Sequence, residues 1–241
     1  MKITKKVEAS YCFTTKVKKK KKTTEKIECK EESASATASS VAVASASIGT
    51  FVLTAAHVCD DDSLRGRLEA AKKVKEIDSY EVTETIKVLT LSSNSYKADV
   101  VALNHDLDLC LMFVEDLNMK PIKRHYKALQ NGQLVYNIAS PLGIFAHDAV
   151  PVFAGHYSGN LRKGVDIFSV PATGGSSGSP VVNEEGALVG MVHSVFFGFR
   201  HVAMSPTLAD INKFIDQGVD KYENDWYINL LKMSRPKMEN P

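Results

Sequence analysis

Long apolar runs are missing from this sequence of 241 residues. A helix that crosses a membrane needs about 18 or more consecutive apolar residues, and no such stretch occurs, so we expect no membrane association. Residues 1–8 are rich in charge and lack the apolar core of a secretory signal peptide. These two absences predict an intracellular, cytoplasmic protein.

Cysteine is also scarce, with Cys12, Cys29, Cys59 and Cys110 scattered along the chain and no C-x-x-C pair. Such a distribution is more typical of isolated thiols in a reducing compartment than of a zinc site or a disulfide framework. A secreted mature form, from which a signal has been removed, is the alternative that stays open.

Neither sign of charge is in excess, because 30 Lys and Arg residues are balanced by 28 Asp and Glu residues, for a net charge of +2. Nucleic-acid binding relies on a strongly basic surface, so we expect no nucleic-acid partner. The acidic triplet at residues 60–62 lacks the spaced ligands of a calcium loop, and the histidines outside the motifs described below have no metal-ligand spacing. We therefore expect no metal and no cofactor.

The N-terminal segment contains two strand-like runs, residues 7–17 and 23–31, on either side of the lysine run 18–22. Alternating apolar residues in both runs predict a β-hairpin with a lysine-rich tip. A run of like charges at a loop tip is typical of a solvated turn, which we favour over a phosphate-binding patch. Residues 33–48 consist almost entirely of Ala, Ser and Val, and we interpret them as strands with small side chains rather than as a linker.

The most informative stretch is G-G-S-S-G-S-P-V-V at residues 174–182. Its glycines permit a tight turn that leaves backbone N–H groups uncovered, although a Gly/Ser loop between two strands has the same composition. We interpret Ser177 as a nucleophile, and the N–H groups of Gly175 and Ser177 as an oxyanion hole for the negative oxygen that forms when a serine attacks a carbonyl. A serine nucleophile also needs a base and an orienting carboxylate from elsewhere in the chain.

A histidine and an aspartate occur earlier in suitable settings. His57 follows the strongly β-forming run 49–54, after small residues that let the backbone pack closely around an imidazole. Asp106 and Asp108 both precede the apolar run 109–114, and a carboxylate at the mouth of a strand is well placed to orient an imidazole. We favour Asp108 because the residues after it run unbroken into the strand, and Asp106 stays the alternative.

Several segments resemble trypsin-like serine endopeptidases, with the motifs in the order His, Asp, Ser. They are T-A-A-H-V-C at 54–59, the aspartate stretch at 105–114, the serine loop, and Q-L-V-Y-N-I-A-S-P-L-G at 133–143, which is similar to the start of the second barrel of HtrA-like proteases. The resemblance implies an all-β fold of two six-stranded antiparallel β-barrels, the chymotrypsin-like double barrel, with a C-terminal helix. Too little chain follows for a PDZ domain.

The resemblance also implies an activity. His57, Asp108 and Ser177 would form the catalytic triad of a serine endopeptidase that cleaves protein or peptide substrates through an acyl-enzyme. A catalytically silent member of the fold, used as a binding module, is the alternative. The expected parts are an N-terminal hairpin extension (1–32), a first barrel with the His and the Asp (33–120), a second barrel with the Ser (121–205) and a C-terminal helical segment (206–241).

The serine loop, which begins at Thr173, is similar to that of glutamyl endopeptidases, in which a threonine and a histidine bind an acidic or amide side chain before the cut. This likeness implies a Glu or Gln preference at that position, P1, with Thr173 and His193 in the pocket. His193 is one residue further from Ser177 than the family spacing, and a shift of one residue in a strand turns a side chain to the opposite face. A small apolar pocket bounded by Val195 and its neighbours is the alternative.

Two positions depart from the family pattern. Ser176 stands where digestive relatives have an aspartate that pairs with a newly cut N-terminus, so we expect no activation of that kind. Residues 36–40, A-T-A-S-S, stand where relatives have a glycine-rich strand. The stand-alone module is similar to viral or phage proteases, which would place it in a host cytoplasm, and the sequence leaves the oligomeric state open.

Overall fold

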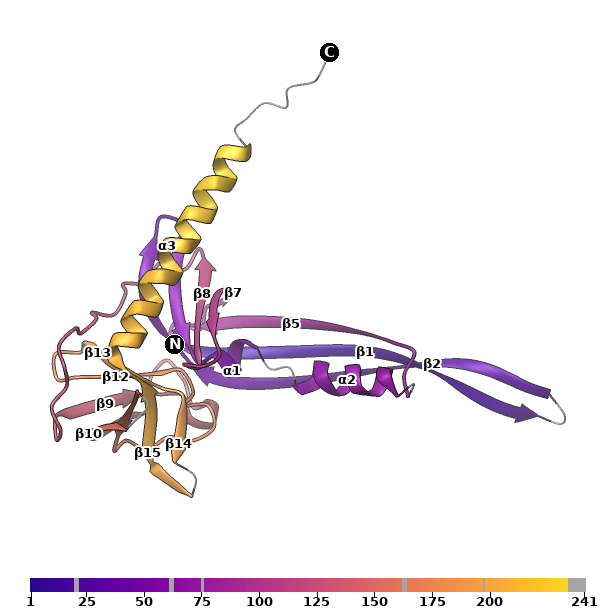
Figure 1. Ribbon diagram of the computed structural model, residues 1–241, viewed down its shortest axis with the longest axis horizontal. Coiled ribbons are helices and arrows are strands. Elements are labelled where there is room, and N and C mark those ends of the chain that lie inside the picture. The colour runs from indigo at the N-terminus through magenta and orange to yellow at the C-terminus, as the bar shows by residue number, and fades with distance from the viewer. Residues whose placement is uncertain (20–21, 61–62, 75, 162–163, 197, 234–241) are drawn as a thin grey trace, which may run out of the picture.

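The computed structural model describes residues 1–19, 22–60, 63–74, 76–161, 164–196 and 198–233. Within this part the chain forms three antiparallel β-sheets and a long C-terminal helix, together with shorter helices (Figure 1). The lysine-rich tip predicted at residues 18–22 lies outside the part whose side chains are described. The strands are β1 (Lys2–Lys19), β2 (Lys22–Ser39), β3 (Val41–Ala46), β4 (Gly49–Thr54), β5 (Ser79–Leu89), β6 (Ser95–Lys97), β7 (Asp99–Asn104), β8 (Leu109–Glu115), β9 (Leu134–Ile138), β10 (Val152–Leu161), β11 (Val165–Phe168), β12 (Ser179–Val182), β13 (Leu188–Val192), β14 (Ser194–Phe196) and β15 (Phe199–Pro206), and the helices are α1 (Ala56–Cys59), α2 (Ser63–Lys73), η1 (Pro141–Gly143) and α3 (Leu208–Met233).

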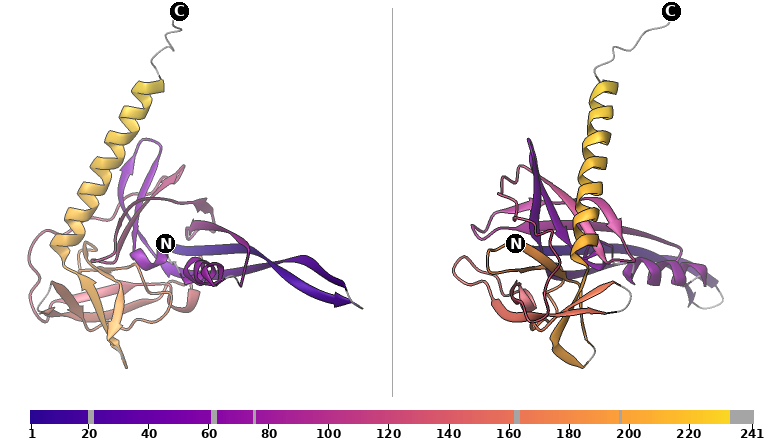
Figure 2. Two further views of the ribbon diagram at one scale, coloured as in Figure 1. Left: turned by 45° about the vertical axis from the view of Figure 1, so that its right-hand side comes forward. Right: turned by 60° about the vertical axis from the view of Figure 1, so that its left-hand side comes forward.

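The first sheet has the strand order β2-β1-β5-β6 and is dominated by the hairpin of β1 and β2. This hairpin projects far from the rest of the molecule, with β5 beside its inner part, and the projection is visible from every side shown (Figures 1 and 2). The two strands pair without a register shift from Lys2 opposite Ser39 to Lys19 opposite Lys22. The inner end of the hairpin, at Ser39, is therefore part of the protein body, whereas the tip is remote from it.

The second sheet, β3-β4-β8-β7, surrounds the larger hydrophobic core. β4 and β8 are buried over almost their whole length, which explains why their sequences are apolar or small at every buried position instead of alternating. Phe51 and Met112 are fully buried at its centre. Ile211 and Ile215 of α3 and Leu188 of β13 pack into the same core, so this core joins the two halves of the chain.

The third sheet, β13-β12-β9-β10-β11-β15-β14, encloses a second core that includes Val135, Phe168, Val181 and Val189. The serine loop enters this sheet directly, because β12 begins at Ser179. β13 pairs with β12, and β14 follows β13 after a single residue. The serine loop and the start of β14 are thus brought to the same end of the sheet.

α3 is one continuous helix that packs on the first core and then extends away from the body (Figure 1). Thr207 caps its start, since the Asp210 N–H donates to Thr207 Oγ1 at 3.1 Å and the same hydroxyl donates to the Asp210 carboxylate at 2.6 Å. No helix in the described part of the chain is long and apolar enough to cross a membrane.

The predicted all-β fold of two antiparallel barrels with a C-terminal helix is confirmed. The strands are distributed differently from the predicted six and six: among the described residues, eight strands, β1–β8, precede residue 120 and seven, β9–β15, follow it. The N-terminal hairpin accounts for the extra strands of the first half, because its paired strands continue to Ser39. The division of the chain at residues 32, 120 and 205 stays a prediction.

The prediction of isolated thiols is wrong. Disulfides join Cys12 to Cys29 and Cys59 to Cys110, and no cysteine is free. Cys12 and Cys29 lie directly opposite each other in the hairpin, and Cys59 in α1 meets Cys110 in β8. The pairs are separated by 17 and 51 residues in the sequence, so strand register and folding bring them together rather than a spacing motif.

Candidate active site

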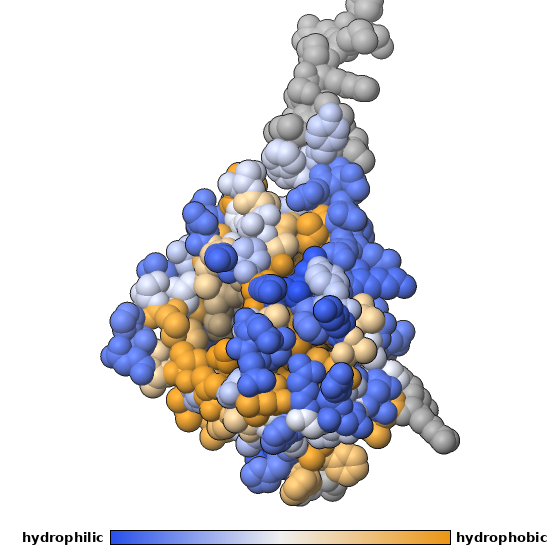
Figure 3. All heavy atoms as spheres, turned by 90° about the vertical axis from the view of Figure 1, so that its left-hand side faces the viewer, coloured by the Kyte–Doolittle hydropathy of each residue, from blue (hydrophilic) through white to orange (hydrophobic). Residues whose placement is uncertain are grey.

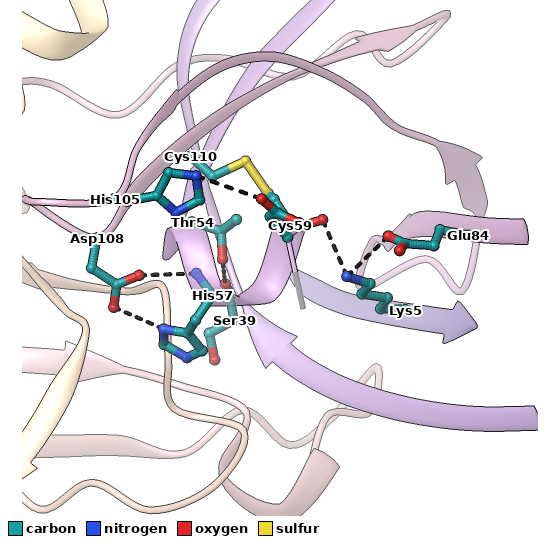
Figure 4. Close-up of a disulfide and its surroundings, with 10 residues drawn as sticks. Lys5, Ser39, Thr54, His57, Cys59, Glu84, His105, Asp108 and Cys110 are labelled. Atoms are coloured by element: carbon teal, nitrogen blue, oxygen red, sulfur yellow. Dashed lines mark hydrogen bonds and ion pairs between the residues drawn. A yellow bond between two sulfur atoms is a disulfide. The ribbon is translucent and has the colours of Figure 1, made fainter. Parts of the chain in front are cut away.

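His57 is held by the one-turn helix α1, directly after β4. The small residues around it are buried, which lets the backbone pack closely there. Cys59 of the same helix is bonded to Cys110 of β8, and its carbonyl accepts a hydrogen bond from Lys5 Nζ of β1 at 3.1 Å (Figure 4). The helix is thus fixed to the first two sheets, while the imidazole itself is 51% exposed.

Asp108 orients His57 through both of its carboxylate oxygens (Figure 4). Oδ1 accepts a hydrogen bond from the His57 backbone N–H at 2.9 Å, and Oδ2 lies 2.7 Å from His57 Nδ1. Burial alone would raise the pKa of the Asp108 carboxyl, but the hydrogen bonds and the charge of His57, with a smaller contribution from His193, hold this pKa below its ordinary value of 3.8. Asp108 is therefore ionised beside the imidazole, whereas Asp106, the alternative, is exposed.

Ser177 faces the other side of the imidazole, with its Oγ 2.9 Å from His57 Nε2. The turn that places it there uses two glycines in the left-handed region, Gly175 at φ 93° and Gly178 at φ 81°. A Cβ on Gly175 would lie 2.5 Å from the Ser140 carbonyl oxygen, so a larger residue could not enter without moving the backbone. The direction of the Ser177 side chain thus depends on the glycines that flank it.

The N–H groups of Gly175 and Ser177, predicted as an oxyanion hole, donate no hydrogen bond to any described residue. The Gly174 carbonyl belongs to the same peptide group as the Gly175 N–H, and it accepts a hydrogen bond from the Leu142 N–H at 2.7 Å. Because the C=O and N–H of a trans peptide point in opposite directions, the Gly175 N–H points away from Leu142. Two N–H groups without an internal acceptor are available to a developing oxyanion.

Ser39, at the end of β2, holds the serine loop from behind, and the sequence did not single it out. Its backbone N–H donates to the Ser177 carbonyl at 2.8 Å, and its hydroxyl donates to the Gly175 carbonyl at 2.8 Å. The same hydroxyl accepts a hydrogen bond from the Ser140 N–H at 2.8 Å, and the Ser39 carbonyl accepts one from Thr54 Oγ1 at 2.9 Å (Figure 4). A single side chain that is 1% exposed therefore connects the hairpin to the serine loop.

A cavity of about 200 Å³ opens beside Ser177. The three residues predicted to bind substrate, Thr173, His193 and Val195, all line it. Arg200 of β15 lines it too, and its Nη1 donates to Thr173 Oγ1 at 3.1 Å. The sequence offered no signal for Arg200, because its place depends on the pairing of β15 with β14 rather than on a local motif.

His193 stays on the wall of this pocket in spite of its longer spacing from Ser177. Its Nδ1 lies 3.8 Å from Asp108 Oδ2, and its side chain is 19% exposed. Burial lowers the pKa of the His193 imidazole below its ordinary value of 6.5; the Asp108 charge opposes this shift, and the charge of His57 adds to it. At about pH 7 His193 is therefore a neutral hydrogen-bonding group.

The surface near the pocket is of mixed character. Phe196 and Phe199, at the ends of β14 and β15, are each 54% exposed. The side of the molecule that carries the third sheet shows hydrophobic patches between hydrophilic ones (Figure 3). Among the described residues, no group of three or more His, Cys, Asp or Glu side chains is placed to hold a metal ion.

Residues 38–191 match the family described as trypsin-like peptidase domain, a span that contains His57, Asp108 and Ser177. Among solved structures the chain is similar to the serine endoprotease from Yersinia pestis, with a TM-score of 0.60 and 17% sequence identity. That likeness covers 89% of this chain but only 62% of the solved chain, and at this identity it concerns the fold. No curated protein matches the sequence.

Proposed function

This chain belongs to the family of trypsin-like peptidases, and on that premise we propose that it is a serine endopeptidase with His57, Asp108 and Ser177 as its catalytic triad. The observation that carries the proposal is the position of the imidazole, with Nδ1 2.7 Å from Asp108 and Nε2 2.9 Å from Ser177 Oγ. One ring nitrogen is held by a carboxylate while the other faces a hydroxyl, which is the arrangement that lets an imidazole remove the hydroxyl proton.

The reaction follows from these contacts. His57 Nε2 takes the Ser177 proton as Oγ attacks the substrate carbonyl carbon, and the ionised Asp108 stabilises the imidazolium that forms. The N–H groups of Gly175 and Ser177 bind the oxyanion of the tetrahedral intermediate. His57 then gives its proton to the leaving amine, the C–N bond breaks, and an ester to Ser177 remains. Water, deprotonated by His57, attacks this ester; His57 returns the proton to Ser177 Oγ as the ester bond breaks, and the acid is released.

The proposal extends to P1, where we infer a preference for Glu or Gln. Thr173 and His193 line the cavity beside Ser177, and their hydroxyl and ring N–H can donate to a carboxylate or to an amide oxygen. The similarity of the serine loop to that of glutamyl endopeptidases supports the same preference. A pocket governed by Val195 and its apolar neighbours would instead favour small apolar side chains.

The test is cleavage of a diverse peptide library at neutral pH, with the new termini identified by mass spectrometry. Ser177→Ala removes the nucleophile, and Ser179→Ala is the matched control, because the buried Ser179 hydroxyl has no hydrogen-bond partner among the described residues. We expect cuts with the parent protein and with Ser179→Ala, and none with Ser177→Ala. A folded parent protein that cuts nothing would favour the catalytically silent binding module, and equal cutting by Ser177→Ala would exclude this serine as nucleophile.

Protein or peptide substrates are the expected partners, and the predictions of no nucleic-acid partner and no membrane partner are unchanged. The cytoplasmic location, in a host cell if the protein is viral, also stays a prediction. The two disulfides weigh against it, because disulfides persist mainly in oxidising compartments.

A further inference from the structure

Arg200 is the cationic side chain of the pocket beside Ser177. It lies on β15, one residue after the strand begins, and lines the same cavity as Thr173, His193 and Ser177. One N–H of its guanidinium donates to Thr173 Oγ1 at 3.1 Å. The guanidinium is thus held at the Thr173 hydroxyl, which we propose as part of the P1 pocket.

The charge of Arg200 is not neutralised within the described part of the chain. Arg65, Arg67 and Arg124 each have a carboxylate oxygen within 3.8 Å, whereas Arg200 has no such ion pair among the described residues. No Asp or Glu of the part of the chain that the structure describes lines the cavity either. A positive charge without a counter-charge, at the wall of a pocket next to a nucleophile, favours a substrate side chain that carries the missing negative charge.

The chemistry of the guanidinium favours one class of substrate side chain, the carboxylates. It is charged at every working pH and presents five N–H donors in a planar fork, of which one is used on Thr173. The remaining donors can form charge-assisted hydrogen bonds to a carboxylate, and these are about twice as strong as bonds between neutral groups. Thr173 and the neutral His193 can hold a carboxylate or an amide alike, so they do not distinguish Glu from Gln.

We propose that Arg200 is a specificity-determining residue, which makes this peptidase cleave after glutamate in preference to glutamine. The inference rests on the proposed function, because it takes the cavity beside Ser177 as the P1 pocket. It goes beyond that function in assigning the choice between acid and amide to one side chain of β15.

The first test uses three fluorogenic peptides that differ only at P1, with Glu, Gln or Lys. The parent enzyme should show a kcat/KM for the Glu peptide at least about tenfold above that for the Gln peptide. In Arg200→Gln this ratio should fall to about one, because the Glu peptide loses the charge-assisted hydrogen bonds to the guanidinium. Arg200→Glu should cleave the Lys peptide better than the Glu peptide.

A control variant separates the pocket charge from net charge. Arg67→Gln makes the same change on an exposed side chain that pairs with Glu32 of the hairpin, and should keep the parent's Glu to Gln ratio. If Arg200→Gln keeps that ratio while Ser177-dependent cleavage continues, the role of Arg200 is refuted and the proposed function stands. If Arg200→Gln and Arg67→Gln reduce the ratio equally, the effect is one of net charge and the proposal also fails.

A binding measurement tests Arg200 without catalysis. Fluorescence anisotropy with the labelled Glu and Gln peptides, on Ser177→Ala and on Ser177→Ala/Arg200→Gln, should show tighter binding of the Glu peptide to the first protein only. If the peptides bind in this way but the parent protein cleaves nothing, Arg200 still recognises glutamate and the proposed function is refuted. Equal affinities of the two peptides for Ser177→Ala would overturn the proposal.

Discussion

The proposed reaction centre, formed by His57, Asp108 and Ser177, and the proposed P1 pocket share Ser177 but are built in different ways. The centre consists of three side chains at strand ends, held from behind by buried groups such as Ser39 and by the disulfide at Cys59. The pocket is lined by the serine loop and by residues of β13, β14 and β15, and its polar side chains Thr173, His193 and Arg200 are half-buried or exposed. We infer that buried contacts hold the geometry of the proposed triad, whereas the choice of substrate depends on a few accessible side chains.

The largest expected effect is at the centre. Asp108→Asn should lower kcat by about 10⁴-fold with little change in KM, because the amide favours the wrong tautomer of His57 and cannot stabilise its cation. Asp106→Asn is the matched control and should leave kcat unchanged, since Asp106 is exposed. Steady-state kinetics on one peptide distinguish the two. A loss confined to Asp106→Asn would reassign the triad.

A smaller effect on kcat is expected from a substitution of Ser39, which forms hydrogen bonds to the serine loop. Ser39→Ala removes the hydrogen bonds to the Gly175 carbonyl and from the Ser140 N–H, and leaving such buried groups unpaired costs about 1–3 kcal/mol. The unpaired Gly175 carbonyl should let its peptide shift, and with it the N–H groups that bind the oxyanion. We therefore expect kcat to fall by about 10- to 100-fold while KM changes little.

Ser40→Ala is the control for Ser39, because the adjacent Ser40 hydroxyl is equally buried but has no hydrogen-bond partner among the described residues. A peptide aldehyde, which mimics the tetrahedral intermediate, provides a second readout. Its affinity should fall with kcat in Ser39→Ala and stay unchanged in Ser40→Ala. Equal losses in both variants would mean that Ser39 contributes only to stability.

One disulfide, Cys59–Cys110, lies beside the proposed triad, and the other, Cys12–Cys29, lies in the remote hairpin. Loop-closure entropy alone assigns about 4 kcal/mol to the 51-residue loop of Cys59–Cys110 and about 3 kcal/mol to the 17-residue loop of Cys12–Cys29. Cys59→Ala/Cys110→Ala should lower both the melting temperature and kcat, because α1 carries His57.

The hairpin disulfide should matter less for catalysis. At about 3.3 Å per residue, Cys12 and Cys29 lie roughly 30 Å along the strands from the end at Ser39. Cys12→Ser/Cys29→Ser should therefore keep kcat within about twofold of the parent. Calorimetry and steady-state kinetics on both pairs check this, and a kcat loss that is larger in the hairpin variant would show that the projecting hairpin acts on the active site.

The smallest expected effect is that of pH on the ratio of kcat/KM for the Glu and Gln peptides. The lowered pKa of His193 makes it neutral above its ordinary value of 6.5, and Arg200 stays charged, so the Glu to Gln ratio should be flat between about pH 7 and 9. Below that range His193 begins to gain charge and the ratio should rise. A ratio that falls steeply as pH increases from about 7 to 9 would mean that His193, with a raised pKa, carries the recognition instead.

The elements of the centre could be predicted because each is a local pattern. His57, Asp108 and Ser177 follow or precede a strand that is recognisable from its apolar residues, and glycines with positive φ mark the serine turn. The remaining contacts are tertiary. Ser39 is 136 residues from Gly175, and it lies in a low-complexity segment where relatives carry glycines, so no pattern indicated that its side chain would support the serine loop.

The role of Arg200 and the pairing of the cysteines could not be predicted from the sequence, because both depend on tertiary contacts. Arg200 looks like any surface arginine in the sequence, and its role depends on the pairing of β14 with β15 and on a hydrogen bond to Thr173. The register of the hairpin sets Cys12 opposite Cys29, but a register cannot be read from two alternating runs whose connection has an unknown length.

The catalytic role of Ser177 is tested most directly by its reaction with a fluorophosphonate, followed by intact-mass analysis and peptide mapping. We expect one adduct per chain, located on Ser177, with a rate that drops sharply in His57→Ala and Asp108→Asn but not in Asp106→Asn. A folded protein that forms no adduct, or forms it on another serine, would contradict the assignment of these three residues as a catalytic triad.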